Sequence, residues 1–329
     1  MMKPASMPST RTIKFNLSSG LLSLILSIGV GQSTAEQIPI YEQGNGGKHS
    51  HAVVAVDARK WFHQTQLPWG GSWFNNELQH YTNRLENAYV SDGSLKIVAK
   101  KETFSDQGHT KQYTSARLNA KYAFKYGRVV VRAKLPTGTG TWPAIWTLGK
   151  NINEAGAYWQ TQGFGNTTWP ACGEIDIMEH WGSKQNFVQS AMHTPSSHGG
   201  TINHGGQVID TASTQFHVYE MDWQRDKIIF RVDGVEHYRY APKIRTSSTW
   251  PYTSEQYLLL NIAIEPSIDS SFNQSAMEID YVRVYAENAG PTEQPVWADE
   301  FNTSTLQATD ANSNNATTVK TAKTEVHHH

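Results

Sequence analysis

The stretch Gly173-Glu174-Ile175-Asp176-Ile177-Met178-Glu179 alternates acidic and apolar residues. Such an alternation is typical of a half-buried β-strand, in which successive side chains point to opposite faces. Glu174 and Asp176 therefore share one face, and Ile175 and Ile177 point into the core. Glu179 lies an odd number of residues from both of these acids, so in a regular strand its side chain would point to the opposite face. We expect a β-bulge near Ile177 and Met178, because one extra residue returns Glu179 to the face of the other two acids.

Three carboxylates on one face of a strand are suited to acid–base chemistry. The rise of a strand places the Cα atoms of the outer pair, Glu174 and Glu179, roughly 13 Å apart. Glutamate side chains that lean inward bring the carboxyl groups to the ~5 to 5.5 Å used in retaining glycoside hydrolysis. Mutual repulsion raises the pKa of at least one acid, so that one carboxyl is a proton donor while another is an anionic nucleophile. From these residues alone, the alternative to an acid–base active site is an acidic strand face exposed to solvent, or a cation site.

The chain from residue 59 to residue 286 consists of short alternating runs separated by Gly, Pro, Asn and Asp. Residues 227–232 and 235–240 flank Asp233-Gly234, a dipeptide that favours a type I′ hairpin turn. Residues 257–264 are almost all apolar and predict a central strand, and residues 277–285 predict another. We therefore expect an all-β fold, a two-sheet β-jelly-roll sandwich of the concanavalin-like kind.

Charge limits the partners that this chain can bind. It has 28 Lys and Arg against 29 Asp and Glu, and its net charge of -1 at pH 7 lacks the basic surface that nucleic acid or an anionic membrane requires. Charged residues make up only 17% of the chain, which contains 11 Trp, 14 Tyr and 11 Phe. We expect an uncharged partner and a monomeric protein.

Aromatic rings beside polar side chains indicate a sugar-binding surface, because sugar rings stack on flat apolar faces and their hydroxyls need polar partners. A buried core position is the alternative for each single Trp. The candidate substrate-binding residues are Asn76, Arg117, Trp142, Trp146, Trp169, His193 and Asn261.

No organic cofactor or zinc site is expected. His193, His198 and His204 lie in a Gly/Ser-rich segment and match no compact zinc-ligand spacing. The single cysteine, Cys172, has no partner for an internal disulfide and is expected to be a small buried apolar residue.

The two ends of the chain differ from its centre. Residues 1–35 combine basic residues, a short apolar run and small residues before position 36, a pattern typical of a signal peptide. No other segment approaches the ~20 apolar residues of a membrane-spanning helix, so we expect a secreted, extracellular or periplasmic protein. Residues 36–58 form an N-terminal extension, and residues 308–329 are a polar tail that ends in a histidine tag.

Residues 60–286 resemble glycoside hydrolase family 16, and within it the bacterial laminarinases, which are endo-acting β-1,3-glucanases. The resemblance is most specific at Gly173–Glu179 and extends to Asn75-Asn76-Glu77-Leu78-Gln79, Trp142-Pro143-Ala144-Ile145-Trp146 and Asp280-Tyr281-Val282-Arg283-Val284-Tyr285. It implies that Glu174 is the nucleophile, that Glu179 is the general acid/base and that Asp176 supports Glu174. The implied reaction is a double displacement with retention at the anomeric carbon.

The order of the segments departs from the family. Its members begin with a strand similar to Trp297-Ala298-Asp299-Glu300-Phe301, followed by a segment similar to Lys60-Trp61, whereas here the first of these comes last. A circular permutation predicts that residues 287–295 are a linker and that residues 296–307 return to complete the sandwich beside the strand ending at Tyr285. The alternative is the start of a truncated second copy of the domain.

The resemblance also implies a structural calcium ion, held by a carbonyl near the opening strand, a glycine carbonyl and an aspartate. The matching positions are Glu300, Gly93 and Asp280. Oxygen ligands from separate segments suit calcium, which here would tie the terminal segment to the body of the domain.

Two other functions remain open at this point. A non-catalytic carbohydrate-binding sandwich would keep the aromatic surface without needing three crowded acids. A related hydrolase would act on mixed-linkage glucan or on a marine, sulfated galactan, although the low net charge disfavours a sulfated polymer.

Overall fold

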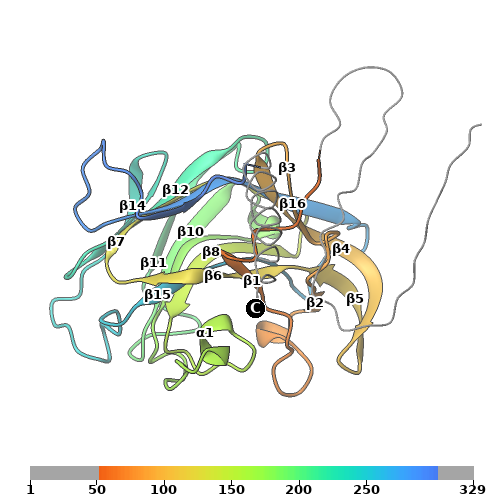
Figure 1. Ribbon diagram of the computed structural model, residues 1–329, viewed down its shortest axis with the longest axis horizontal. Helices are drawn as coiled ribbons and strands as arrows, with labels where there is room; N and C mark the ends of the chain where they lie inside the picture. The colour runs from red at the N-terminus through yellow and green to blue at the C-terminus, as the bar shows by residue number, and fades with distance from the viewer. Residues whose placement is uncertain (1–51, 303–329) are drawn as a thin grey trace, which may run out of the picture. The chain divides into compact units, whose positions relative to one another are not determined.

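The computed structural model describes residues 52–302; the predicted signal peptide, most of the N-terminal extension and residues 303–329 lie outside the described residues. Two β-sheets stack against each other (Figure 1). In the seven-stranded sheet the strands are ordered β1 (Trp61–His63), β6 (Arg117–Phe124), β15 (Gln256–Ile264), β8 (Thr141–Gly149), β9 (Glu174–His180), β10 (Phe187–His193) and β11 (His204–Val208). The predicted all-β sandwich is confirmed.

The ten-stranded sheet forms the second layer. Its main path is β14 (Val235–Tyr240), β13 (Ile228–Val232), β12 (His217–Trp223), β7 (Gly127–Lys134), β16 (Gln274–Tyr285), β4 (Ser94–Asp106), β5 (His109–Ser115) and β2 (Gln79–Tyr81). Off this path, β3 (Ala88–Ser91) pairs with β4 and β17 (Trp297–Asp299) pairs with β16.

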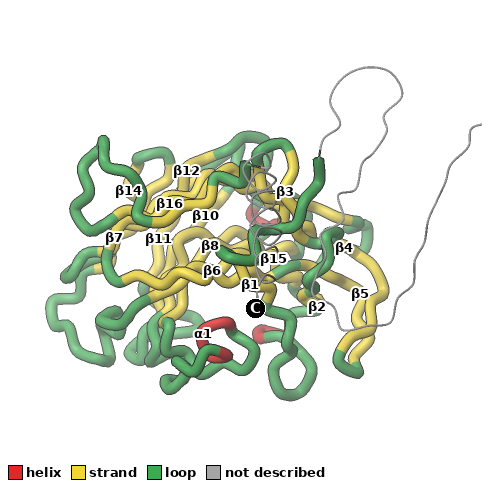
Figure 2. The backbone as a smooth tube through the Cα atoms, in the orientation of Figure 1, coloured by secondary structure: helices red, strands yellow, loops and turns green. Residues whose placement is uncertain are grey.

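Helical segments are short and lie between strands (Figure 2). They are α1 (Tyr158–Thr161) and the 3₁₀ turns η1 (Phe74–Asn76) and η2 (Gly182–Lys184). Within residues 52–302 the structure has no helix that is long and apolar enough to cross a membrane.

Strand β15 lies inside the seven-stranded sheet, between β6 and β8, and all nine of its residues are buried. Leu258, Leu260 and Ile262 point into the main core between the sheets. Tyr257 and Leu259, on the opposite face, belong to a second apolar cluster that also contains Cys172. Burial of one such leucine side chain contributes ~1.5–3 kcal/mol, so β15 is a rigid support for what its neighbours carry.

Strands β13 and β14 form the predicted hairpin. Its turn residues Asp233 and Gly234 have φ values of 50° and 79°, and two successive positive φ angles are the signature of a type I′ turn.

Both ends of the described chain pack on the sandwich. Val54 bridges to Val90 of β3, and Val56 is in the main core, so the expected boundary at residue 58 is several residues too late. At the other end, β17 pairs antiparallel with β16, where Val282 lies opposite Asp299. The Asp299 carboxylate accepts a 2.8 Å hydrogen bond from the Trp61 indole, which connects this last strand to β1.

Candidate active site

The acidic strand β9 contains the predicted β-bulge. Against β8, Met178 pairs with Ile145 and Asp176 pairs with Trp146, so that one residue of β9, Ile177, has no opposite number. The pairing with β10 shifts over the same interval. Ile177 and Met178 are both in the main core. The bulge therefore places Glu174, Asp176 and Glu179 on the same face, as expected.

Strand register brings most of the candidate binding residues to this carboxylate face, because residues directly opposite each other on paired strands point the same way. Across the sheet in one direction, Trp146 lies opposite Asp176. In the other direction, His193 of β10 lies opposite Glu174. Further out, Asn261 of β15 lies opposite Arg117 of β6. Residues separated by up to 144 positions in the sequence thus share one surface.

Glu174 is held by an indole. Trp169, in the loop before β9, donates a 2.7 Å hydrogen bond from Nε1 to Glu174 Oε2. The Trp169 ring is 40% exposed, so a ligand can also reach its face. This tryptophan was predicted to bind substrate; the structure gives it the additional task of orienting a carboxylate.

Asp176 is almost fully buried and lies against His193. The backbone N–H of Gly199 donates to His193 Nδ1 at 3.0 Å, which leaves Nε2 as the N–H of the ring. His193 Nε2 lies 3.1 Å from Asp176 Oδ2 and 3.6 Å from Glu174 Oε1. The imidazole therefore faces both carboxylates, a position closer to the acids than a purely sugar-binding role requires.

Glu179 has its own indole partner. Trp142 donates a 3.2 Å hydrogen bond from Nε1 to Glu179 Oε1. The Trp142 ring stacks on Trp181, with ring centroids 5.7 Å apart and an interplanar angle of 24°. Glu174 and Glu179 are thus oriented by different tryptophans, one at each end of the acidic strand.

The pKa values of all three acids are raised. Burial is the main cause for Glu174, with repulsion from Asp176 second, while the Trp169 hydrogen bond acts in the opposite direction. Burial also raises the pKa of Glu179, again with repulsion from Asp176 second. Burial raises the pKa of Asp176 to about 7. Close acids with raised pKa values hold protons near neutral pH, so the site contains a proton donor beside carboxylates that can ionise.

Arg117 and Asn261 are buried beneath the carboxylate face and are not exposed on it. Arg117 is 3% exposed, and its guanidinium lies 4.8 Å from the Trp146 ring centroid. Asn261 accepts a 2.7 Å hydrogen bond from the Trp146 indole and donates to the Tyr81 hydroxyl. Both side chains therefore fix the orientation of Trp146, whose ring is partly exposed.

Two partners of Arg117 were not predicted. Gln64 Oε1 accepts from Arg117 Nε at 2.9 Å, and the Glu154 carboxylate lies 3.2 Å from Nη2. Because these residues come from loops far from β6 in the sequence, no local pattern marks them. Asn76, the remaining candidate, is exposed at the end of η1 with a φ of 58°.

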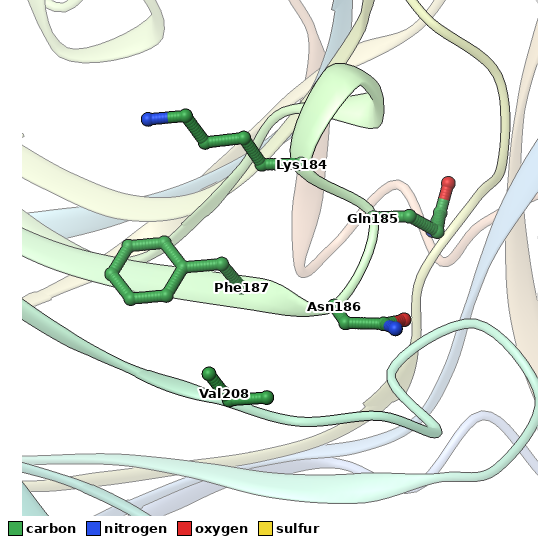
Figure 3. Close-up of a pocket in the computed structure, with 5 residues that line it drawn as sticks. All are labelled: Lys184, Gln185, Asn186, Phe187 and Val208. Carbon is green, nitrogen blue, oxygen red and sulfur yellow. The ribbon is translucent and has the colours of Figure 1, made fainter.

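A shallow hollow of about 520 Å³ lies at the β10–β11 edge (Figure 3). Phe187 and Val208 are paired and, by alternation with Gln189 opposite Glu179, belong to the carboxylate face. The hollow is lined by Lys184, Gln185, Asn186, Phe187 and Val208. It extends the carboxylate face beyond β9.

The expected calcium residues come from neighbouring segments of the other sheet. On β16, Ile279 lies opposite Leu95, near the start of β4 and close in sequence to Gly93. Further along the same strand, Val282 lies opposite Asp299, the residue before Glu300. Asp280 is between these two pairings. The Glu300 side chain pairs with Arg283, so the backbone carbonyl of Glu300 is the oxygen left to bind a metal ion. The Asp280 carboxylate also lies 2.7 Å from the Arg132 guanidinium. Two carbonyls and a carboxylate from three segments fit calcium.

Comparisons with known proteins agree with this geometry. The description Glycosyl hydrolases family 16 matches residues 74–283. The Beta-glucanase of Rhodothermus marinus is 34% identical over 282 residues, which cover 80% of this chain and 92% of the relative.

Two solved structures are similar over 70% of this chain. LamA from Z. galactanivorans, in complex with laminaritriose and laminaritetraose, is 47% identical with a TM-score of 0.64 over 93% of that chain. The laminarinase from Flavobacterium sp. UMI-01 is 38% identical with a TM-score of 0.59 over 94% of that chain. With the matched residues, the stacked sheets and the bulged acidic strand together, the chain belongs to glycosyl hydrolases family 16.

Proposed function

We propose that this protein cleaves internal linkages of β-1,3-glucan by a retaining double displacement, with Glu174 as nucleophile and Glu179 as general acid/base. The chain is an endo-acting glycoside hydrolase. The observation that carries the assignment of roles is the bulged strand β9, which presents Glu174, Asp176 and Glu179 on one face with a separate indole on each glutamate.

In the first step the Glu174 carboxylate attacks the anomeric carbon and the glycosidic C–O bond breaks. Glu179 gives its proton to the departing oxygen, so a glycosyl ester forms on Glu174 and the leaving sugar is neutral. In the second step Glu179, now a carboxylate, takes a proton from water, whose oxygen attacks the same carbon and releases Glu174. Two inversions give net retention.

Asp176 and His193 support the nucleophile. Repulsion from Asp176 keeps a proton on the acid pair until the substrate is bound, while the Trp169 N–H and the His193 N–H favour the ionised form that attacks. Trp142, Trp146 and Trp181 supply flat apolar surfaces for successive glucose rings, in keeping with an uncharged polymer.

The test is product analysis on purified protein with laminarin, mixed-linkage glucan and a sulfated galactan. We expect laminarin to release reducing ends fastest, NMR to show the β-anomer as the first product, and Glu174→Ala to abolish release. A carbohydrate-binding protein without activity would bind laminarin but release nothing, and an inverting enzyme would give the α-anomer first.

Three further features belong to the same proposal. The N-terminal pattern of residues 1–35 supports export, which N-terminal sequencing of the secreted protein tests. The pairing of β17 with β16 supports a circularly permuted order of strands. A calcium ion at Gly93, Asp280 and Glu300 would stabilise the joint between β4, β16 and β17 and take no part in bond cleavage.

A further inference from the structure

The β-bulge that aligns the acids has a hydroxyl behind it. Ile177, the extra residue of β9, has no partner in the register with either β8 or β10. The Ser190 hydroxyl of β10 donates a 2.7 Å hydrogen bond to the Ile177 carbonyl. Ser190 is fully buried and, by alternation with Gln189 and Ala191, points away from the carboxylate face into the space between the sheets.

This bond matters because a bulge interrupts the ladder of backbone hydrogen bonds. A buried carbonyl without a partner costs about 1–3 kcal/mol, and a strand relieves that cost by shifting its backbone. Glu179 is two residues from Ile177, so a shift at the bulge moves the acid/base relative to Glu174.

Ser190 is itself held by a chain of hydrogen bonds through His237 of the other sheet and Gln207 of the neighbouring strand β11. His237 Nε2 lies 2.7 Å from Ser190 Oγ, and Gln207 Nε2 lies 3.0 Å from His237 Nδ1. An amide NH₂ only donates, so His237 Nδ1 accepts and Nε2 carries the hydrogen. His237 then donates to Ser190, which directs the Ser190 hydrogen to Ile177. Burial lowers the pKa of His237 to about 4, so the ring is neutral at neutral pH, as this arrangement needs.

A glycine permits the approach of the two elements. His237 is on β14 and Gln207 is on β11. A Cβ at Gly205 would lie 2.9 Å from the Tyr238 ring and 3.0 Å from the His237 carbonyl, distances shorter than normal side-chain contacts. The small residue on β11 therefore lets β14 come close enough for His237 to reach Ser190.

We infer that Ser190, oriented by His237 and Gln207, is a positioning residue that fixes the bulge of β9 and thereby the placement of Glu179 relative to Glu174. The inference rests on the roles proposed above for the two glutamates. Ser190 contacts no substrate, so its effect is expected on the step that needs proton donation.

The experiment compares two substrates that differ in this need. Laminarin has a sugar leaving group that must be protonated, whereas 2,4-dinitrophenyl β-laminaribioside has a leaving group that departs without an acid. We expect Ser190→Ala to lower kcat/KM for laminarin about tenfold more than for the dinitrophenyl glycoside. The ratio of the two values, measured on one preparation, does not depend on the fraction of folded protein.

Two variants test the chain of bonds. Ser190→Thr keeps the hydroxyl and is expected to keep the ratio within about twofold of the unmodified protein. His237→Phe removes the donor that orients Ser190 and is expected to shift the ratio in the same direction as Ser190→Ala. If Ser190→Ala does not fold, His237→Phe carries the test.

Ser213→Ala is the matched control. The Ser213 hydroxyl also accepts from a side-chain nitrogen, that of Gln185, and donates to a backbone carbonyl, that of Pro136, at 3.0 Å. Its loss is expected to lower stability without changing the ratio. Equal losses on both substrates in Ser190→Ala and His237→Phe would overturn the inference, whereas an unmodified protein inactive on both substrates would overturn the proposed function itself.

Discussion

At the scale of single residues, the two glutamates depend on their indole partners. An N–H aimed at a carboxylate stabilises the ionised form and restricts the side chain to one orientation. Trp169 does this for Glu174 and Trp142 for Glu179. If these rings only stacked on sugar, Phe could replace Trp. Phe has no N–H, so it cannot replace a Trp that donates a hydrogen bond to the acid.

Trp169→Phe separates these two tasks. Without the N–H the pKa of Glu174 rises, because the hydrogen bond that lowers it is lost. The acidic limb of kcat/KM against pH therefore moves to higher pH, and activity near neutral pH falls about tenfold. Trp159→Phe is the control, since the Trp159 indole donates to the Ala120 carbonyl instead. An unchanged acidic limb in Trp169→Phe would show that the ring acts by stacking alone.

The raised pKa values also make the acids a burden on stability. A carboxyl whose pKa is raised on folding contributes nothing unfavourable below its unfolded pKa, and it destabilises progressively as the pH rises toward its folded pKa. Glu179→Gln, which removes the ionisation, is therefore expected to raise Tm by about 2–4 °C at pH 8 and to leave it nearly unchanged at pH 4. Thermal melts at the two pH values measure this, and a stabilisation larger at pH 4 would contradict it.

At the scale of elements, the sequence predicts the strands better than the contacts between them. The alternation in residues 173–179 indicates both the face of the acids and the bulge, because both follow from a period of two. The hairpin at Asp233-Gly234 is predicted because few other dipeptides tolerate two positive φ angles.

Contacts between distant elements have no such local signal. Ser190 meets His237 because the two sheets pack in a particular way, and Arg117 of β6 meets Glu154 because a distant loop folds over that strand. The hydrogen bonds from Trp142 and Trp169 to the glutamates depend on the side-chain orientation of each indole, which the sequence does not determine. The carboxylates and the residues next to them were therefore predictable, whereas the hydrogen bonds that orient the carboxylates were not.

The terminal element β17 is expected to be part of the folded core. Phe301 is 1% exposed and stacks on Trp61 with ring centroids 6.3 Å apart. Phe301→Ala leaves a cavity and is expected to cost about 3–5 kcal/mol of unfolding free energy, measured by denaturant titration. Val296→Ala, at a 55% exposed position of the same segment, is expected to change it by less than about 0.5 kcal/mol. Equal small effects would mean that the segment only rests on the surface.

At the scale of the whole molecule, one sheet carries the chemistry and the other supports it. The seven-stranded sheet presents the acids, while the ten-stranded sheet holds the segment ends and supplies His237 behind the bulge. The permuted order of strands stays a prediction, as does the calcium ion at the joint where β4, β16 and β17 meet.

Calcium is expected to act on stability and not on catalysis. Adding calcium to chelator-treated protein should raise Tm and leave kcat/KM for laminarin unchanged once the protein is folded, since the predicted ligands are on the sheet without the acids. Asp280→Asn should lose this response, while Arg132→Gln, which removes only the neighbouring cation, should keep it. A Tm unaffected by calcium in the unmodified protein would exclude the site.

In the proposed mechanism Glu174 attacks the sugar and Glu179 moves the proton. In a 2-deoxy-2-fluoro β-laminaribioside the fluorine slows both displacements, while a dinitrophenyl leaving group keeps the first one fast. The covalent intermediate therefore accumulates, and mass spectrometry of peptides locates it. We expect one adduct, on Glu174, in an enzyme that is active on laminarin. An adduct on Asp176 or Glu179, or no adduct in that active enzyme, would contradict this mechanism.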